Sequence, residues 1–132
     1  MPQTNIELAR RAVAAFNDSD ADAFAALTTS DFEWLPSMSP VDGETFVGAD
    51  GVAAYFAALR NAWEYFHVLA DEYREGRDLV LALGRLEGRG KGSGATVDSP
   101  LGMAFELRAG QIARITGYLD YDVALAAVGL ER

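Results

Sequence analysis

Two positions in this chain place opposite charges at a spacing that suits acid–base chemistry. Arg85 and Glu87 are two residues apart in a segment with strand character, so both side chains point to one face. The arginine there would hold a substrate oxygen while the glutamate moves a proton. The same spacing is also common in ion pairs on a sheet face and in dimer contacts, and these interpretations stay open.

Glu33 is a second candidate for a proton acceptor. It stands two residues before Leu35 in the predicted strand 32–35, so the two side chains share a face. If Leu35 faces an apolar pocket, the Glu33 carboxylate is poised there to accept a proton. The alternatives are that the strand turns its other face to the pocket, or that Glu33 caps a neighbouring element.

Several aromatic residues are candidates for a ligand pocket. Tyr55 and Trp63 share the apolar face of a predicted helix, and Tyr118 lies on the last predicted strand. Such residues are mostly core, but a buried tyrosine hydroxyl needs a partner and Tyr55 can present it to a cavity. His67 is the only histidine, and no serine or cysteine nucleophile motif accompanies it. We expect it at the surface or in an interface.

The composition argues against several functions. A net charge of −9 disfavours nucleic acids and anionic membrane surfaces as partners. The absence of cysteine excludes disulfides, thiolate metal sites and a cysteine nucleophile. No cofactor or metal motif is visible, since residues 90–93 lack the ending of a phosphate loop. Without a signal peptide or a long apolar run, a single cytoplasmic domain over residues 1–132 is expected.

The elements that must position these residues follow a segregated order. Helical periodicity dominates the first half and strand periodicity the second, which is typical of an α+β fold. Helices are predicted from a capping box at Thr4, from Asp20, from Gly48 to Trp63, and from a cap at Asp120. Strands are predicted over 32–35, 65–73, 79–87, 100–107 and 112–119. The first half of segment 79–87 is apolar on both faces, which indicates a central strand covered on both sides.

Short motifs in this order carry a family resemblance over nearly the whole chain. They lie at residues 15–20, 31–34, 46–52, 84–94, 105–112 and 122–130, for example Phe46-Val47-Gly48-Ala49-Asp50-Gly51-Val52 before the long helix. The chain resembles the SnoaL-like, ketosteroid-isomerase-related proteins of the nuclear-transport-factor-two-like superfamily. The resemblance implies a cone-shaped, strongly curved mixed β-sheet with helices packed in its concave side, the cystatin-like α+β barrel. It also implies a pocket at the wide end and homodimers that form through sheet faces.

The superfamily includes isomerases, polyketide cyclases, epoxide hydrolases, dehydratases and proteins without catalysis, so fold alone does not define the reaction. Ketosteroid isomerases use a carboxylate base and two oxyanion donors, and the matching positions in this chain are Leu35 for the base and Ala12 and Met103 for the donors. All three are apolar here, so that mechanism is not expected.

The other catalytic patterns of the superfamily match in part. Epoxide hydrolases use an Asp-Arg-Asp set, of which Arg85 and Glu87 would supply two members, while the third position falls near Gly117 or Asp120. Asp120 is also the nearest residue to the acid that the polyketide cyclases use, although a helix cap is the expected role of this side chain.

The sequence therefore supports two hypotheses. The first is a cofactor-free acid–base enzyme, an isomerase, cyclase or hydrolase, with Glu33, Arg85 and Glu87 as catalytic residues. The second is a binding protein without turnover. Both place a small apolar or amphipathic ligand in a pocket, and the predicted ligand-binding residues are Trp34, Leu35, Tyr55, Trp63, Met103 and Tyr118. A pocket without an acid within hydrogen-bond reach would favour the second hypothesis.

Overall fold

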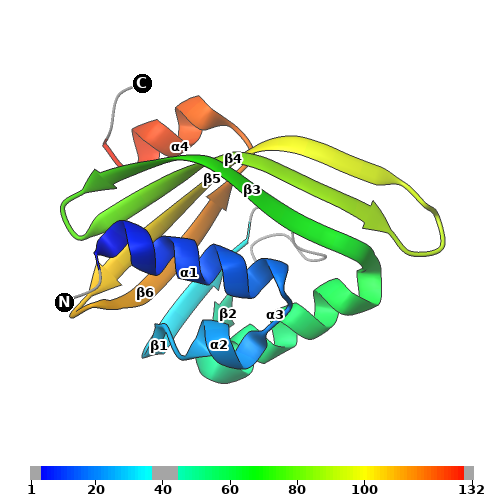
Figure 1. The fold of residues 1–132 in the computed structure, drawn as a ribbon, viewed down its shortest axis with the longest axis horizontal. Helices are drawn as coiled ribbons and strands as arrows, with labels where there is room; N and C mark the ends of the chain where they lie inside the picture. Colours follow the sequence, from blue (N-terminus) through cyan, green and yellow to red (C-terminus); the bar gives the residue numbers. More distant parts are fainter. Residues whose placement is uncertain (1–3, 37–44, 130–132) are drawn as a thin grey trace.

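The computed structural model describes residues 4–36 and 45–129 of the chain. The elements in these residues are α1 (Asn5–Asn17), α2 (Ala21–Ala25), β1 (Thr28–Leu35), β2 (Phe46–Val47), α3 (Gly48–Ala62), β3 (Trp63–Gly76), β4 (Leu79–Gly90), β5 (Thr96–Arg108), β6 (Gln111–Tyr118) and α4 (Tyr121–Ala127) (Figure 1). In this part of the chain no helix is long and apolar enough to cross a membrane.

The strands form one mixed sheet in the order β2-β1-β6-β5-β4-β3. β1 runs parallel to β6, and each other neighbouring pair is antiparallel. The sheet curves around α1, α2 and α3, which occupy its concave face, while α4 lies on the convex face (Figure 1). The predicted α+β fold is confirmed. The sheet stays open, with β2 and β3 as its edges, and does not close into a barrel.

Alternation along β4 builds a core on each face of the sheet. Val80 and Ala82 join the main core under the helices, whereas Leu81 and Leu83 pack with α4 on the convex face. The predicted central strand covered on both sides is therefore confirmed. On β5, Gly102 lets α4 approach closely, since a Cβ atom there would lie 2.6 Å from the Cβ atom of Ala124.

Side chains at the helix ends explain where three helices begin. The Thr4 hydroxyl accepts a hydrogen bond of 3.1 Å from the Glu7 amide, and the Glu7 carboxylate accepts one of 3.4 Å from the Thr4 amide. This is the predicted capping box. Asp20 and Asp120 each accept a 3.0 Å hydrogen bond from an amide in the first turn of α2 and α4. Asp120 is thus a helix cap, as expected.

Several strands extend further than predicted because long-range pairing recruits residues with weak strand character. β1 begins at Thr28, whose carbonyl accepts a 3.2 Å hydrogen bond from the Gln111 side chain. β3 begins at Trp63, which pairs with Gly90 across the β3–β4 ladder. Trp63 therefore belongs to the sheet, and its predicted place on the helix face is wrong.

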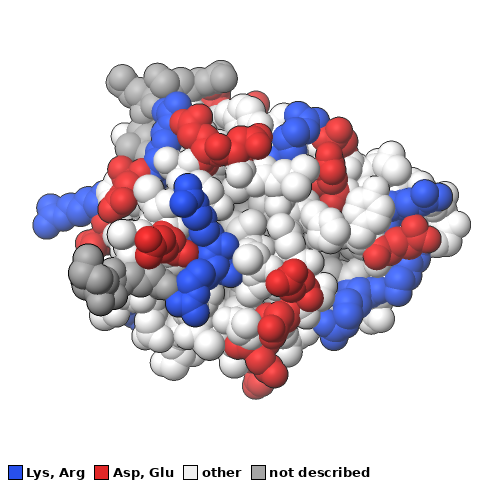
Figure 2. All heavy atoms as spheres, in the orientation of Figure 1, with Lys and Arg blue, Asp and Glu red and all other residues white. Residues whose placement is uncertain are grey.

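Charged side chains of both signs are distributed over the surface. On the face shown in Figure 2, basic and acidic residues are interspersed around an uncharged middle. The net charge of −9 is therefore not gathered into one acidic region on this face.

Candidate functional site

The concave face of the sheet and the helices enclose an apolar cavity, which we call the interior pocket. Its lining residues come from α1, α3 and five of the strands: Phe16, Trp34, Pro36, Tyr55, Phe66, Val68, Leu86, Leu101, Met103 and Gly117. The cavity itself has a volume of about 20 Å³. This volume is room for about one water molecule, so an organic ring fits only after lining side chains move.

Strand alternation determines which side chains reach the interior pocket. On β1, Phe32 and Trp34 are 0% and 2% exposed and face inward, while Glu33 between them faces outward. On β5 the same alternation turns Leu101 and Met103 inward. On β1 the two faces thus divide the aromatic side chains of Phe32 and Trp34 from the charged ones of Asp31 and Glu33.

Tyr55 contributes the one side-chain hydroxyl among the described residues that line the interior pocket. Its ring lies edge-on to Trp34, with centroids 4.6 Å apart, and packs against Phe46 at 4.9 Å. No hydrogen bond joins this hydroxyl to another residue of ranges 4–36 and 45–129. Burial raises the pKa of Tyr55 above its ordinary value, so the phenol stays protonated and can donate a hydrogen bond.

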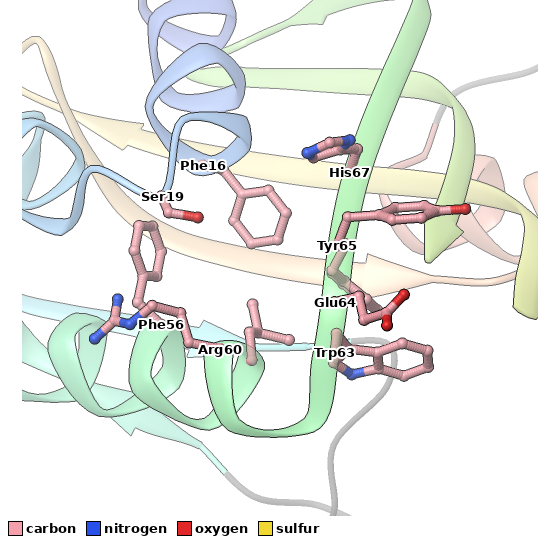
Figure 3. A pocket seen from close by; sticks show the side chains of 10 residues that line it. Phe16, Ser19, Phe56, Arg60, Trp63, Glu64, Tyr65 and His67 are labelled. Atoms are coloured by element: carbon pink, nitrogen blue, oxygen red, sulfur yellow. The ribbon is translucent and has the colours of Figure 1, made fainter. Parts of the chain in front are cut away.

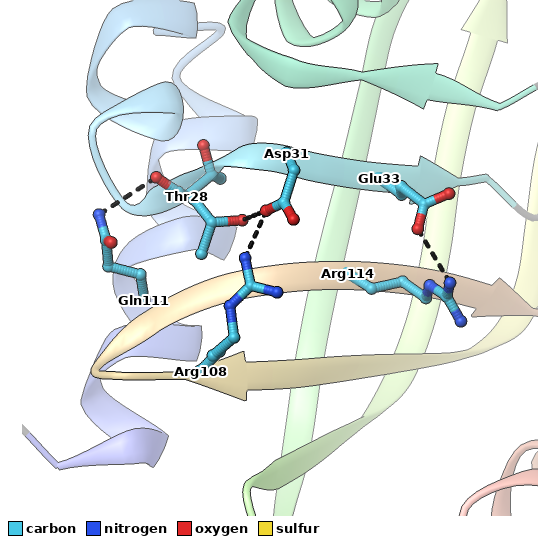
Figure 4. A network of polar contacts seen from close by, with 7 residues as sticks. Thr28, Asp31, Glu33, Arg108, Gln111 and Arg114 are labelled. Carbon is cyan, nitrogen blue, oxygen red and sulfur yellow. Dashed lines mark hydrogen bonds and ion pairs between the residues drawn. The ribbon is translucent and has the colours of Figure 1, made fainter.

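Glu33 lies on the convex face, so its predicted orientation into the pocket is wrong. Its carboxylate accepts a 2.9 Å hydrogen bond from the guanidinium of Arg114 on β6 (Figure 4). That hydrogen bond and the charge of Glu33 raise the pKa of Arg114. The physical reason for the orientation is that Phe32 and Trp34 bury more apolar surface inward than Glu33 and Leu35 would.

The same convex surface carries a row of ion pairs between strands. Asp31 accepts a 2.8 Å hydrogen bond from the Thr29 hydroxyl and pairs with Arg108 of β5 (Figure 4). The Thr29 hydrogen bond, followed by that from Arg108, lowers the pKa of the Asp31 carboxyl. The Asp31–Arg108 pair ties β1 to β5 across the intervening β6 and leaves both charged groups on the outside.

Arg85 and Glu87 also lie on the convex face, beyond α4, and do not line the interior pocket. The Arg85 Nε atom donates a 2.8 Å hydrogen bond to Asp98 on β5, and this hydrogen bond and the charge of Asp98 raise the pKa of Arg85. Glu87 stands opposite His67 in the β3–β4 register. The structure therefore shows an ion pair of Arg85 on a sheet face, with Asp98 rather than Glu87 as its partner.

The predicted ligand-binding residues divide into two groups. Trp34, Tyr55 and Met103 line the interior pocket as expected. The other three do not: Leu35 is half-buried on the convex face, Trp63 lines a separate cleft beside β3, and Tyr118 lines a convex-face groove beside α4.

Sequence reasoning missed several lining residues: Phe16, Phe66, Val68, Leu86 and Leu101. Phe16 had a usable signal, because it ends the apolar stripe of α1 next to a turn. In the described residues no group of three or more histidine or acidic side chains is placed to hold a metal ion.

A protein-family model described as "SnoaL-like domain" matches residues 9–115 of the chain. No curated protein matches this chain. Among solved structures, a protein with a ketosteroid isomerase-like fold from Catenulispora acidiphila, in complex with trimethylamine, is 21% identical with a TM-score of 0.78, over 97% of this chain and 96% of that one.

Two further solved structures are similar over most of their length. TerC, co-crystallised with polyporic acid, is 25% identical with a TM-score of 0.77, over 93% of this chain and 95% of that one. A protein from Xanthomonas campestris, provisionally assigned as a polyketide cyclase, is 22% identical with a TM-score of 0.75 over the same shares. At these identities, the Catenulispora and Xanthomonas structures establish the fold alone.

Proposed function

The chain belongs to the SnoaL-like domain family, and from that premise we propose that it binds a small, flat, apolar molecule in the interior pocket without transforming it. The observation that carries this proposal is the lining itself. Among its described residues there is no acid, histidine, lysine or arginine. A general base must lie within hydrogen-bond distance of the proton that it removes, and these residues provide none.

The shape of the pocket indicates what such a ligand would look like. Phe16, Trp34, Tyr55 and Phe66 surround a narrow space, which favours a planar ring over a branched chain. The Tyr55 hydroxyl favours one hydrogen-bond acceptor on that ring, such as a ketone or an ether oxygen. Small organic molecules accompany two of the similar structures, trimethylamine in one and polyporic acid in the other.

A matched pair of probes tests this proposal. Acetophenone and ethylbenzene have nearly the same size, but only acetophenone accepts a hydrogen bond. Labelling the methionine methyl groups with ¹³C gives three signals, and Met103 reports from the pocket wall. We expect acetophenone to shift the Met103 signal saturably, and to bind about fivefold more tightly than ethylbenzene because of the Tyr55 hydrogen bond.

Two substitutions on β3 serve as a matched control. Val68→Phe fills the interior pocket, whereas Leu69→Phe places the same ring on the opposite, exposed face of the same strand. Binding should be lost in the first variant and kept in the second. A wild-type Met103 signal that neither probe shifts would contradict the proposal, and chemical conversion of a bound ring compound would replace it with the enzyme hypothesis.

We also propose that two copies pair through their convex faces, as the family resemblance implies. A groove on this face lies between α4 and β6, with Thr116 and Tyr118 half-buried along it. Leu35, Thr116 and Ala104 stand side by side in register on β1, β6 and β5, which gives the face an uncharged centre. The described lining residues of the interior pocket lie on the other side of the sheet and come from one chain.

A further inference from the structure

A second cavity lies at the free edge of β3, and we call it the edge cleft. Its lining residues are Phe16, Ser19, Phe56, Leu59, Arg60, Trp63, Glu64, Tyr65, Phe66 and His67, around a cavity of about 120 Å³ (Figure 3). The end of α1 forms one side, the end of α3 forms the floor, and the first residues of β3 form the other side (Figure 3). Only Phe16 and Phe66 are shared with the interior pocket.

The edge of β3 next to this cleft already binds one amide group, that of Asn17. The Asn17 side chain donates a 2.8 Å hydrogen bond to the Val68 carbonyl and accepts one of 2.8 Å from the Val68 amide. A single carboxamide thus takes the place of a neighbouring strand at this position. It also blocks the edge, so that a longer strand cannot add beyond Val68.

The ladder geometry shows that Phe66 offers the same pair of groups. Cβ atoms placed on Gly88 and Gly84 of β4 would lie 3.2 Å from the Tyr65 carbonyl oxygen and 1.8 Å from the Leu69 carbonyl oxygen, so these odd-numbered residues point toward β4. Backbone groups alternate along an antiparallel strand. Phe66, like Val68, therefore turns its N–H and C=O to the free edge, roughly 6.8 Å along the strand from the Asn17 contact.

We propose that the edge cleft binds a small molecule made of an apolar ring and a primary carboxamide or lactam. Its amide would pair with the N–H and C=O of Phe66 as Asn17 pairs with Val68, and its ring would lie against Phe56 and Leu59. A primary or cyclic amide carries its donor and acceptor on one side, as this site requires. An ordinary trans peptide bond does not, and a carboxylate has no donor.

A polar side chain at the rim fits the same ligand. Ser19 has a φ of 56°, in the left-handed region that a non-glycine residue rarely adopts, and its hydroxyl lies on the α1 side of the cleft (Figure 3). His67 lies on the strand side (Figure 3). The Ser19 hydroxyl is placed to bind a polar substituent on the ring or the outer lone pair of the amide oxygen. His67 shares the face of Glu87 across the β3–β4 ladder, so its imidazole points away from Phe66 and does not contact the ring.

Benzamide is the probe that tests this inference. In amide-detected NMR we expect the Phe66 N–H signal to shift saturably at millimolar benzamide, which is the affinity range of a ligand of this size. N-methylbenzamide and benzoate each lose one of the two hydrogen bonds and should bind about fivefold more weakly. N,N-dimethylbenzamide should also bind more weakly. Equal binding of the whole series, or shifts at Met103 without shifts at residues 63–67, would overturn the proposal.

Two variants separate the edge cleft from the interior pocket. Leu59→Phe narrows the edge cleft and should reduce benzamide binding at least fivefold, while the volume-conserving Leu59→Met should not. Val68→Phe fills the interior pocket and should leave the benzamide shifts at Phe66 in place. Retained binding in a folded Leu59→Phe protein would count against the site. If that variant does not fold, the ligand series on the wild-type protein decides.

Discussion

The Tyr55 hydroxyl combines two properties that a ligand-orienting group needs, a fixed ring and a permanent proton. Two aromatic neighbours, Trp34 and Phe46, hold the ring, and burial keeps the phenol neutral. A donor held in this way binds an acceptor without first giving up strong hydrogen bonds to water. This is the reason to expect a preference for ketones over hydrocarbons in the interior pocket.

Tyr55→Phe tests the role of this hydroxyl through pH. The folded-state pKa of Tyr55 is raised, so the folded protein keeps a proton that the unfolded chain releases above about pH 10. The wild-type free energy of unfolding should therefore fall as pH rises through 10, and Tyr55→Phe should remove that part of the loss. Urea unfolding at pH 8 and pH 11 measures it. Equal pH slopes for the two proteins would show that Tyr55 does not carry the effect.

Glu33→Gln tests the assignment of Glu33 to the outer surface. The substitution removes one exposed ion pair with Arg114, so we expect acetophenone binding to be unchanged and the melting temperature to shift by no more than about 2 °C. Calorimetry and the Met103 signal measure both quantities. A loss of binding of more than about fivefold would return Glu33 to the site.

At the scale of the element, two close approaches determine how the layers fit. Gly102 lets α4 rest on β5, and Asn17 ties the end of α1 to the edge of β3. Both contacts join segments far apart in the sequence. A change at either position acts on the packing of a whole element rather than on one side chain.

Gly102→Ala should lower the free energy of unfolding by about 1–3 kcal/mol, because its new Cβ atom would lie 2.6 Å from that of Ala124. Gly76→Ala is the control, since its Cβ atom would meet only the Leu79 side chain at 3.4 Å or more. Urea titrations compare the two. Adding Ala124→Gly to Gly102→Ala should restore part of the stability, and full additivity of the two changes would argue against a direct clash.

Asn17→Ala should lower the free energy of unfolding by about 1–3 kcal/mol, because two half-buried backbone groups of Val68 lose their partner. The Val68 amide should also exchange with solvent faster, and the uncovered edge should make the protein aggregate at lower concentration. Asp18→Ala, at the exposed next position, is the control. Unchanged exchange at Val68 would show that Asn17 does not protect this edge.

The sequence was informative about elements and weak about the direction in which strands face. Alternation correctly indicated that Glu33 and Leu35 share a face, yet it does not say which face is inside. The larger apolar pair, Phe32 and Trp34, carried that information through the surface that they bury. Cavity dimensions were not accessible, because they depend on contacts between distant segments, such as Phe16 of α1 against Phe66 of β3.

At the scale of the whole molecule, the two faces of the sheet carry different roles. The concave face encloses the interior pocket within one chain, and the convex face keeps its centre uncharged between rows of ion pairs. A protein that pairs through the convex face would leave the pocket of each copy accessible. Binding and association should therefore be separable by substitution.

Thr116→Arg tests this separation, because Thr116 lies between Leu35 and Ala104 in the middle of the convex face. Sedimentation should give the wild-type protein twice the 14.2 kDa mass of one chain. In Thr116→Arg two facing copies would bring like charges together, so we expect the mass of a single chain. Thr96→Arg, an exposed position at the start of β5, should remain paired.

Because each interior pocket is built from one chain, the unpaired variant should still bind acetophenone with unchanged affinity. A single-chain wild-type mass would refute the pairing, and lost binding in Thr116→Arg would show that the two faces are coupled.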